Sequence, residues 1–453
     1  MKKNIEIGRE LAEFVVKTEF ADLPDEVVEF SKGLTLKTVA GMTAGSVMPP
    51  GRRVARFIRE RGGLPEVRVI GCDFKASLWN AAFTQAIFAH ASELEDDRFN
   101  GGVSWDITIF PLIFPLAEQL RLSGKDLLVA TAVGHEVHSR TCLFTTEHRG
   151  LTVVPGAVGP AAAAAKALRL NVEETMSALG LAMSGVGISL PNFGTDAHYF
   201  ESSLQCLQGL MSAELAKEGL TGNPDIGTYL INLLGEDKVT PQKIVEELGV
   251  RWVFREIWVK KYPCCFLTHR QIDLLLELVK EHGLSYEQIE EVETHAGPVD
   301  FDRCNRPEPE TIGDLQFSFQ HVLSAAMLDK DVNFAHITTE KIFAPKFKEA
   351  RSKVKLVLHP DWPAVFNSGV ARVVAKLKDG TEFTKERKYP IGSPEQPLTK
   401  DQFKELYCKF VRGVIPEDRI ERTASILLDL EKLTNMEELI EMLCFSHVEP
   451  QQP

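Results

Sequence analysis

The sequence predicts a mainly α protein, in which a large multihelical domain is built from both ends of the chain and a smaller α+β domain is inserted into it. Apolar residues recur every three or four positions from residue 4 to about 260, and again past residue 397. Between these stretches, short segments alternate apolar and polar residues as strands do. We expect the helical domain over 1–262 and 398–453, and the α+β domain, a lid, over 263–397.

The helical domain is predicted segment by segment. Charged residues stand between the apolar residues of segment 1–16. This pattern favours an amphipathic helix over a signal peptide. The small side chains of 159–168 predict a helix that packs closely on a neighbour, and Asn171 with Glu174 forms a capping pattern for the next helix. Further helices are expected over 23–40, 78–97, 124–144 and 204–218.

The inserted domain is predicted from alternation and turn chemistry. A helix over 271–282 precedes strands over 289–295 and 353–358. Asp379-Gly380 predicts a hairpin turn between strands 370–377 and 381–389, because glycine tolerates positive φ. Past Pro397, capping boxes at Thr399/Gln402 and Thr434/Glu437 predict helices that pack back on the first domain.

Composition limits the classes of partner. The 64 acidic and 51 basic side chains give a net charge of −13 with no block of five or six like charges, which disfavours nucleic acid and anionic membranes as partners. No segment has the roughly 18 apolar residues that a membrane span requires. Eight cysteines without a C-x-x-C pair argue against disulfides and zinc. We therefore expect a cytoplasmic protein with free thiols.

The densest polar cluster is HASELEDDR, residues 90–98. On a continuous helix, His90, Glu93 and Asp97 would stack on one face. Carboxylates crowded at a helix C-terminus repel one another and oppose the macrodipole, which tends to raise a pKa and suits a general base. The alternative is a solvated acidic helix end, since charge runs usually face water.

A second cluster is cationic and lies at the expected domain junction. Lys260-Lys261 precedes Tyr262-Pro263, and His269-Arg270 follows a few residues later. In an acidic protein these residues predict a carboxylate-binding site, because ligands often bind at domain junctions. A basic surface turn is the alternative.

Other patterns argue against a metal or nucleotide cofactor. In His135-Glu136-Val137-His138 the histidines are three residues apart, whereas the zinc-peptidase motif needs four, so a core or surface pair is favoured. The GVGISL segment at Gly185 lacks the third glycine and the preceding strand of a dinucleotide loop. We expect no metal and no cofactor.

The chain resembles a known family along most of its length. HASELEDD and the PLIFPLAEQLRLSGKDLLVATAVGHEVHSR stretch are similar to blocks of the 2-methylcitrate dehydratase (MmgE/PrpD) family. The resemblance continues in order through GPAAAAAKALRLN, AKEGLTGNP, KKYPCCFLTHRQID and DLQFSFQHVLSAAML, over about residues 5–400. It implies a homodimer with a cofactor-free active site between two domains, acting on small polycarboxylates by dehydration, decarboxylation or epimerisation.

The resemblance also implies site residues. The first acidic residue of the family's block falls on Glu93, its lysine before Tyr-Pro on Lys261, and a histidine on His269. Four positions differ from the family's pattern. Ser104 and the Thr152 segment lack the family's histidines, His198 stands at a lysine position and His321 at a tyrosine position.

We therefore expect an enzyme that abstracts a proton next to a substrate carboxylate and then eliminates, epimerises or decarboxylates. The base is Glu93 or Asp96, the acid candidates are His198, His269 and His321, and Lys261 stabilises the developing charge. The substrate-binding candidates are Asp97, Ser104, Arg149, Thr152 and Arg270.

These residues are predicted to converge on one small carboxylate substrate. Two alternatives remain open. One is a non-catalytic carboxylate-binding homologue, because the catalytic positions vary. The other is a magnesium-dependent prenyl-transferring enzyme that uses ELEDDR, although no second acidic motif accompanies it.

Overall fold

The computed structural model describes residues 2–61, 63–97, 106–148, 151–185 and 187–446. Helices predominate in these ranges, which confirms the mainly α class. The chain forms two compact units, Met1–Ile257 with Thr399–Pro453, and Trp258–Leu398. The first junction therefore lies five residues before the predicted bound of 262, and the second lies one residue after 398. No helix in the described part of the chain is both long and apolar enough to cross a membrane.

The first unit is helical. Its helices are α1 (Lys2–Lys17), α2 (Asp25–Val47), α3 (Pro49–Arg61), α4 (Leu78–Ala91), α5 (Asp106–Leu120), α6 (Gly124–Thr141), α7 (Val158–Ala167), α8 (Val172–Ala182), α9 (Asp196–Lys217), α10 (Ile226–Leu234), α17 (Lys400–Val411), α18 (Glu417–Leu428) and α19 (Glu437–Met442). Short antiparallel strands accompany them: β1 (Val67–Arg68) with β2 (Lys75–Ala76), and β3 (Thr146–His148), β4 (Leu151–Val153) and β5 (Ile188–Ser189).

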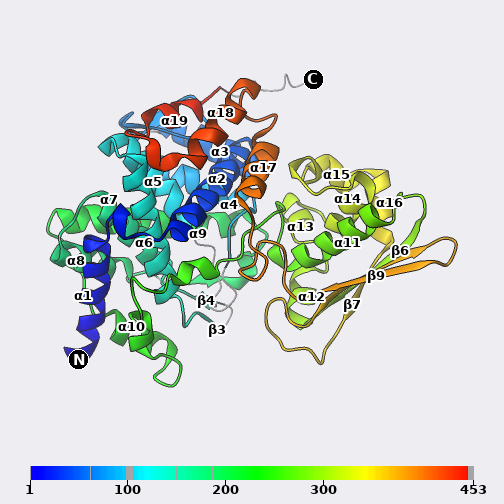
Figure 1. Ribbon diagram of the computed structural model, residues 1–453, viewed down its shortest axis with the longest axis horizontal. Coiled ribbons are helices and arrows are strands. Elements are labelled where there is room, and N and C mark those ends of the chain that lie inside the picture. The colour runs from blue at the N-terminus through cyan, green and yellow to red at the C-terminus, as the bar shows by residue number, and fades with distance from the viewer. Residues whose placement is uncertain (1, 62, 98–105, 149–150, 186, 447–453) are drawn as a thin grey trace. The chain divides into compact units, whose positions relative to one another are not determined.

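The C-terminal helices return to the N-terminal ones, as predicted. Both α17 and α18 pack on α2, and α19 packs on α5 (Figure 1). The capping boxes at Asn171/Glu174 and Thr399/Gln402 are confirmed. The box predicted at Thr434 is wrong, because the Asn435 side chain accepts the Glu437 N–H at 2.7 Å and α19 begins only at Glu437.

Helices α6 and α7 approach closely because small residues face each other. A Cβ added at Gly134 would lie 2.6 Å from the Cβ of Ala163, and one at Gly159 would lie 2.3 Å from the Cβ of His138. Both distances are well inside van der Waals contact, so only glycine fits at either position. The predicted close packing of the alanine-rich helix is thereby confirmed.

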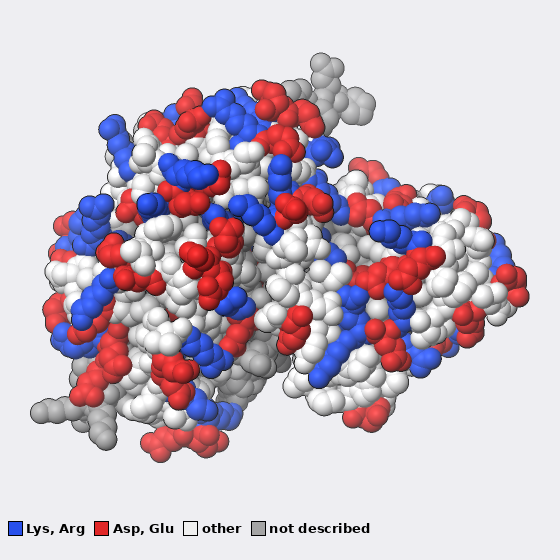
Figure 2. Space-filling model, viewed as in Figure 1, with Lys and Arg blue, Asp and Glu red and all other residues white. Residues whose placement is uncertain are grey.

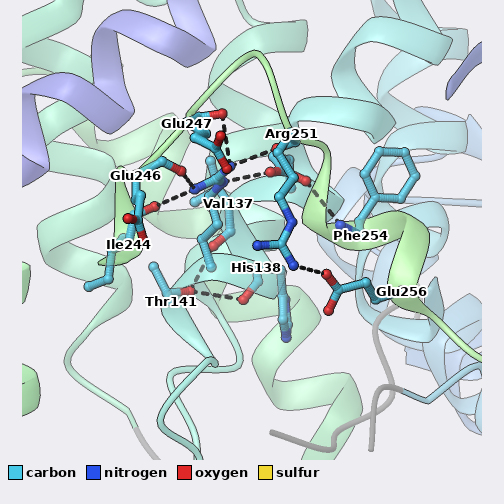
Figure 3. A network of polar contacts seen from close by, with 11 residues as sticks. Val137, His138, Thr141, Ile244, Glu246, Glu247, Arg251, Phe254 and Glu256 are labelled. Atoms are coloured by element: carbon cyan, nitrogen blue, oxygen red, sulfur yellow. Dashed lines mark hydrogen bonds and ion pairs between the residues drawn. The ribbon is translucent and has the colours of Figure 1, made fainter. Parts of the chain in front are cut away.

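A buried ion pair on α6 organises the loop that follows α10. Arg140 Nε donates to Glu136 at 2.5 Å, while the other Glu136 oxygen accepts the Phe254 N–H at 3.0 Å. The terminal nitrogens of Arg140 donate to carbonyls of loop residues drawn in Figure 3: Ile244, Glu246, Glu247 and Arg251.

The histidines of the same helix are core residues. His135 Nδ1 donates to the Thr131 carbonyl at 2.7 Å, and His138 is fully buried against Gly159. The two histidines are therefore a core pair, one of the two alternatives predicted from their spacing.

We expect Arg140→Met to destabilise the first unit by about 3–5 kcal/mol, because it leaves the buried Glu136 carboxylate without its cation. Urea unfolding measures the loss. Arg255→Met is the control, since Arg255 is exposed and its pair with Glu26, at 3.5 Å, should contribute less than about 1 kcal/mol. Equal stability of the two variants would contradict a structural role for Arg140.

The second unit is α+β. Its elements are α11 (His269–Glu281), β6 (Ile289–Ala296), α12 (Pro298–Cys304), α13 (Ile312–Gln316), α14 (Phe319–Asp329), α15 (Thr339–Phe343), α16 (Pro345–Ser352), β7 (Val354–Leu358), β8 (Ala371–Leu377) and β9 (Glu382–Arg387). The sheet order is β7-β6-β8-β9, with β6 and β7 parallel and the other pairs antiparallel. The predicted strands and the hairpin at Asp379-Gly380 are confirmed, with Gly380 at φ +87°.

One face of this sheet is apolar and the other is charged. Side chains of β6 and β8, including Val292, Val373 and Ala375, share a core with α11 and α14. On the opposite side, Lys376 pairs with Glu291 at 2.8 Å and with Glu293 at 3.1 Å. Cationic and anionic side chains also alternate over the face of the molecule seen in Figure 2.

Candidate active site

The polar cluster HASELEDDR was predicted to continue a helix, but it does not. Helix α4 ends at Ala91, and Glu93 takes the left-handed conformation at φ +53°. Its N–H donates to the His90 carbonyl at 2.9 Å, while Ser92 Oγ donates to Ala89 at 2.6 Å. The predicted stacking of His90, Glu93 and Asp97 on one helix face is therefore wrong. The chain turns instead, and Asp97 lies half-buried beyond the turn.

This turn gathers a buried group of side chains. His90, Glu93 and Glu95 are 1%, 2% and 4% exposed, and one nitrogen or oxygen of each lies within 4.8 Å of the others. An imidazole and two carboxylates at this separation have the donor set for a divalent cation. They equally suit proton transfer, because neighbouring carboxylates favour a shared proton. The predicted acidic helix end is therefore not solvated.

The ring of His90 contacts a serine hydroxyl. Ser202 Oγ lies 2.7 Å from His90 Nδ1 and 3.0 Å from the Tyr199 carbonyl. The neutral ring has one donor nitrogen and one acceptor nitrogen. When Ser202 gives its proton to the Tyr199 carbonyl, it accepts from His90 Nδ1, and His90 Nε2 is then the acceptor nitrogen of the ring.

The predicted acid His198 lies beside this group. Its ring centroid is 4.4 Å from that of His90 and 4.2 Å from that of Phe193. His198 Nδ1 lies 3.8 Å from Glu201. Burial alone would raise the pKa of Glu201, but His198 and the Ser189 N–H hold that pKa below its usual range. Glu201 therefore lies close enough to form an ion pair with a protonated His198 ring, a neighbour that sequence analysis missed.

The alternative base, Asp96, belongs to a buried ion-pair network. Lys37 Nζ lies 2.6 Å from Asp96 and 2.8 Å from Asp106, and it also donates to the Leu94 carbonyl. Burial acts to lower the pKa of Lys37, yet the two carboxylates raise it above its ordinary value. Burial likewise acts to raise the pKa of Asp106, and Lys37 and Thr38 keep it low. Asp96 is thus bound by a cation, which leaves Glu93 as the better candidate base.

Sequence analysis did not find Lys37 or Asp106. The signal was a lysine inside the long apolar helix α2 and an aspartate at the start of the apolar helix α5. Buried charges of opposite sign are usually paired. Such a lysine and aspartate could therefore have been proposed as partners.

Lys261 and His269 belong to the second unit. Lys261 Nζ donates to Asp273 at 2.7 Å, and Tyr262 donates to the same carboxylate oxygen at 2.8 Å. The His269 ring stacks on Phe266, with centroids 4.6 Å apart. Burial, with Lys260 nearby, places the pKa of His269 well below its usual value, so this ring is neutral at pH 7.

Arg270 is committed to its own unit. It is 1% exposed and donates to the carbonyls of Gly369 at 3.0 Å and Lys388 at 3.2 Å. Burial lowers the pKa of Arg270 to about 10. Its contacts support a structural role for the guanidinium, and a contact with substrate stays a prediction.

His321 has different surroundings from His269. Its Nε2 donates to the His336 carbonyl at 2.8 Å, and its ring lies against Phe347. Burial lowers the pKa of His321 to about 3. Both rings are therefore neutral donors or acceptors at pH 7, whereas the sequence suggested imidazoles that titrate near neutrality.

Thr152, another predicted substrate-binding residue, lies on β4. It pairs there with Glu147 of β3 and with Ile188 of β5. Ser104 and Arg149 lie outside the described residues. Their roles stay predictions.

Buried neutral histidines should make the fold sensitive to acid. Burial lowers the pKa of His135 to about 4 and of His321 to about 3, whereas an unfolded histidine titrates near pH 6.5. The unfolded chain then binds more protons, so stability is complete above about pH 6.5 and falls toward the folded pKa. The slope is about 1.4 kcal/mol per pH unit for each histidine.

Urea unfolding between about pH 7 and pH 5 tests this expectation. His321→Asn should reduce the slope by the share of one histidine, and His282→Asn, at an exposed position, should not. An unchanged slope in His321→Asn would show that His321 protonates in the folded state.

Two family models match most of the chain. The MmgE/PrpD N-terminal domain model matches residues 9–228, and the MmgE/PrpD C-terminal domain model matches residues 262–432. The chain is 25% identical to the cis-aconitate decarboxylase of Mus musculus, over 93% of this chain and 90% of that protein. It is 26% identical to the Homo sapiens enzyme of the same name, over 93% and 91%, and 24% identical to one from Aspergillus terreus, over 93% and 92%. The chain therefore belongs to the MmgE/PrpD family.

Proposed function

We propose that this protein is a cofactor-independent lyase or isomerase that moves a proton at the carbon next to a carboxylate of a small di- or tricarboxylate. The observation that carries the proposal is the buried group of His90, Glu93 and Glu95, with His198 against the His90 ring. A base, a second carboxyl group and an imidazole within a few ångströms of one another are what such proton transfers need.

The proposed chemistry assigns one step to each group. Glu93 takes the proton from the substrate carbon, and the electron pair moves into the adjacent substrate carboxylate. That pair then expels a hydroxyl group, which His198 protonates to water, or the carbon is reprotonated on its other face. In a decarboxylation, the C–C bond to a carboxylate breaks, CO₂ leaves and the carbon accepts a proton from the same groups.

Decarboxylation is the first reaction to test, because the three relatives named above are called cis-aconitate decarboxylases. The left-handed backbone of Glu93 supports its role as the reacting group. A non-glycine residue in that conformation costs of order 1 kcal/mol, and such strain is concentrated at functional sites.

A ligand screen followed by isotope exchange tests the proposal. Tri- and dicarboxylates, cis-aconitate among them, are screened by thermal shift, since a ligand at 100 times its dissociation constant adds about 2.7 kcal/mol of stability. Ligands that bind are incubated in D₂O, and deuterium at carbon or released CO₂ is measured. We expect exchange or turnover with at least one.

Three other outcomes of this experiment would each favour a different function. Firm binding with no exchange into any carboxylate would favour the non-catalytic homologue. Turnover of an allylic diphosphate with Mg²⁺ would favour the prenyl-transferring alternative. Carboxylate turnover that stops on chelation and returns with metal would contradict cofactor independence. It would also indicate that His90, Glu93 and Glu95 bind a metal ion.

Lys261 is proposed to bind a substrate carboxylate. Asp273 takes one of the three donors of its ammonium group, and the side chain remains 18% exposed. We expect Lys261→Met to weaken binding of the best dicarboxylate by about 10–100-fold, the loss of one charged hydrogen bond. Lys280→Met, at an exposed position on α11, is the control in the same titration. Unchanged affinity in Lys261→Met would remove Lys261 from the site.

A further inference from the structure

The first unit contains a pocket of about 610 Å³ whose lining residues are all different from those of the candidate active site. It is formed by the end of α1, the start of α6 and the end of α7, three helices that pack on one another (Figure 1). A pocket of this volume suits a small organic ligand, because such sites usually measure roughly 300–1,000 Å³. An inorganic ion would fill only a small part of it.

Two lysines in the pocket have unused hydrogen-bond donors. Lys166 Nζ donates to the Val16 carbonyl at 3.0 Å and to Glu19 at 3.1 Å, which leaves one of its three N–H groups. Lys125 Nζ lies 5.1 Å from the centroid of the Phe20 ring, and it makes no ion pair with a carboxylate in the described part of the chain. Both ammonium groups can therefore bind an added anion.

The third cation of the pocket, Arg169, is also available. Its nearest carboxylate is that of Asp126, where one oxygen accepts the Ser123 N–H at 3.0 Å and the Ser123 hydroxyl. Arg169 Nη2 lies 4.0 Å from the other Asp126 oxygen, which is too far for a hydrogen bond. The lining thus holds three cations and only two carboxylates, in a chain whose net charge is −13.

Much of the remaining lining is apolar. Leu122, Val129, Ala167 and Leu170 are buried, and the Phe20 ring beside Lys125 is half-buried. An ion alone would leave this surface in contact with water. A ligand with an apolar part would cover it and gain the free energy of burying apolar area.

We propose that this pocket binds a small organic anion. A phosphate or carboxylate group would lie on Lys125, Lys166 and Arg169, and an apolar or aromatic body would lie against Phe20. Guanidinium and ammonium groups bind both kinds of anion through charge-assisted hydrogen bonds. The proposed ligand is additional to the substrate, and the proposal does not depend on the reaction that the protein catalyses.

The backbone at Arg169 allows a matched pair of variants. Arg169 follows the end of α7 in the left-handed conformation, at φ +56°, where glycine is usual. Arg169→Gly therefore removes the guanidinium and relieves the backbone, while the freer unfolded chain offsets that gain, so stability should change little. Arg121 is exposed, follows the end of α5 at φ +53° and does not line the pocket. Arg121→Gly removes the same charge from the same conformation and is the control.

Equilibrium dialysis of the full chain measures binding. The probes are naphthyl phosphate and naphthylacetate, which carry the two candidate anionic groups on one aromatic body. We expect at least one of them to bind, and the tighter of the two identifies the preferred anion. Naphthol and inorganic phosphate each lack one half of the proposed ligand, so they should bind at least about 10-fold more weakly.

The variants show whether the probe occupies this pocket. Arg169→Gly and Lys125→Met should each weaken binding of the better probe by about 10-fold, the loss of one charged hydrogen bond, and Arg121→Gly should not. Lys261→Met should also leave this binding unchanged, which separates the pocket from the proposed carboxylate site. Lys125 is exposed, so its variant decides the question if Arg169→Gly proves unstable.

Three results would overturn the proposal. The first is that neither naphthyl compound binds. The second is that naphthol or inorganic phosphate binds as tightly as the better probe. The third is that the probe binds equally well to wild-type protein and to the double variant Lys125→Met/Arg169→Gly, which would place it elsewhere on the molecule.

Discussion

Replacing Glu93 by glutamine is expected to lower proton exchange at the substrate carbon by about 10³-fold, the contribution of a positioned general base. Glutamine keeps the size and hydrogen-bonding reach of glutamate but cannot accept the proton. Binding should be retained, because the carboxylate-binding cation is unchanged. Deuterium incorporation and thermal shift with the same ligand measure the two properties separately.

Glu95→Gln is the matched control, because Glu95 belongs to the same buried group. We expect it to lower exchange much less than Glu93→Gln. If the two effects are reversed, the base is Glu95. If neither variant loses exchange, the proposed role of this group is wrong, whatever the stability of the variants.

Replacing Lys37 by methionine is expected to destabilise the first unit by about 3–5 kcal/mol. The substitution removes the cation that contacts both Asp96 and Asp106, and it leaves these two buried carboxylates close together. Chemical denaturation near pH 7 measures the loss. Lys17→Met, at an exposed lysine that pairs with Glu13, should lose less than about 1 kcal/mol.

The pH dependence gives a second measurement on the same network. The low pKa of Asp106 contributes stability above about pH 4, which is lost as the pH falls through the folded pKa. The raised pKa of Lys37 contributes stability below about pH 10, which is lost as the pH rises through the folded pKa. Without Lys37, the pH dependence of stability in the acidic range should reverse. Mild acid should then stabilise the variant, because it protonates one of the two carboxylates.

Combining Lys37→Met with Asp96→Asn and Asp106→Asn tests the cause. If unpaired charge is responsible, the triple variant should recover stability relative to Lys37→Met. If it is less stable than the single variant, packing and not charge accounts for the effect.

The sequence by itself determined the elements whose signals are local. Helix periodicity, the alternation of β6 and β8, the Asp379-Gly380 turn and the caps at Asn171 and Thr399 each depend on residues a few positions apart. The box at Thr434 failed because the neighbouring Asn435 accepts the Glu437 N–H. Residue type alone does not decide which of two adjacent polar side chains accepts it.

The tertiary structure decided the site. Residue type does not predict a turn at Glu93, because glutamate has no preference for positive φ. The turn is held by contacts with distant elements: Ser92 fits against Gly41, and Lys37 binds the Leu94 carbonyl and Asp96. Those contacts supply the free energy that offsets the strain, so a segment that periodicity extends as helix ends at Ala91 and brings His90, Glu93 and Glu95 together.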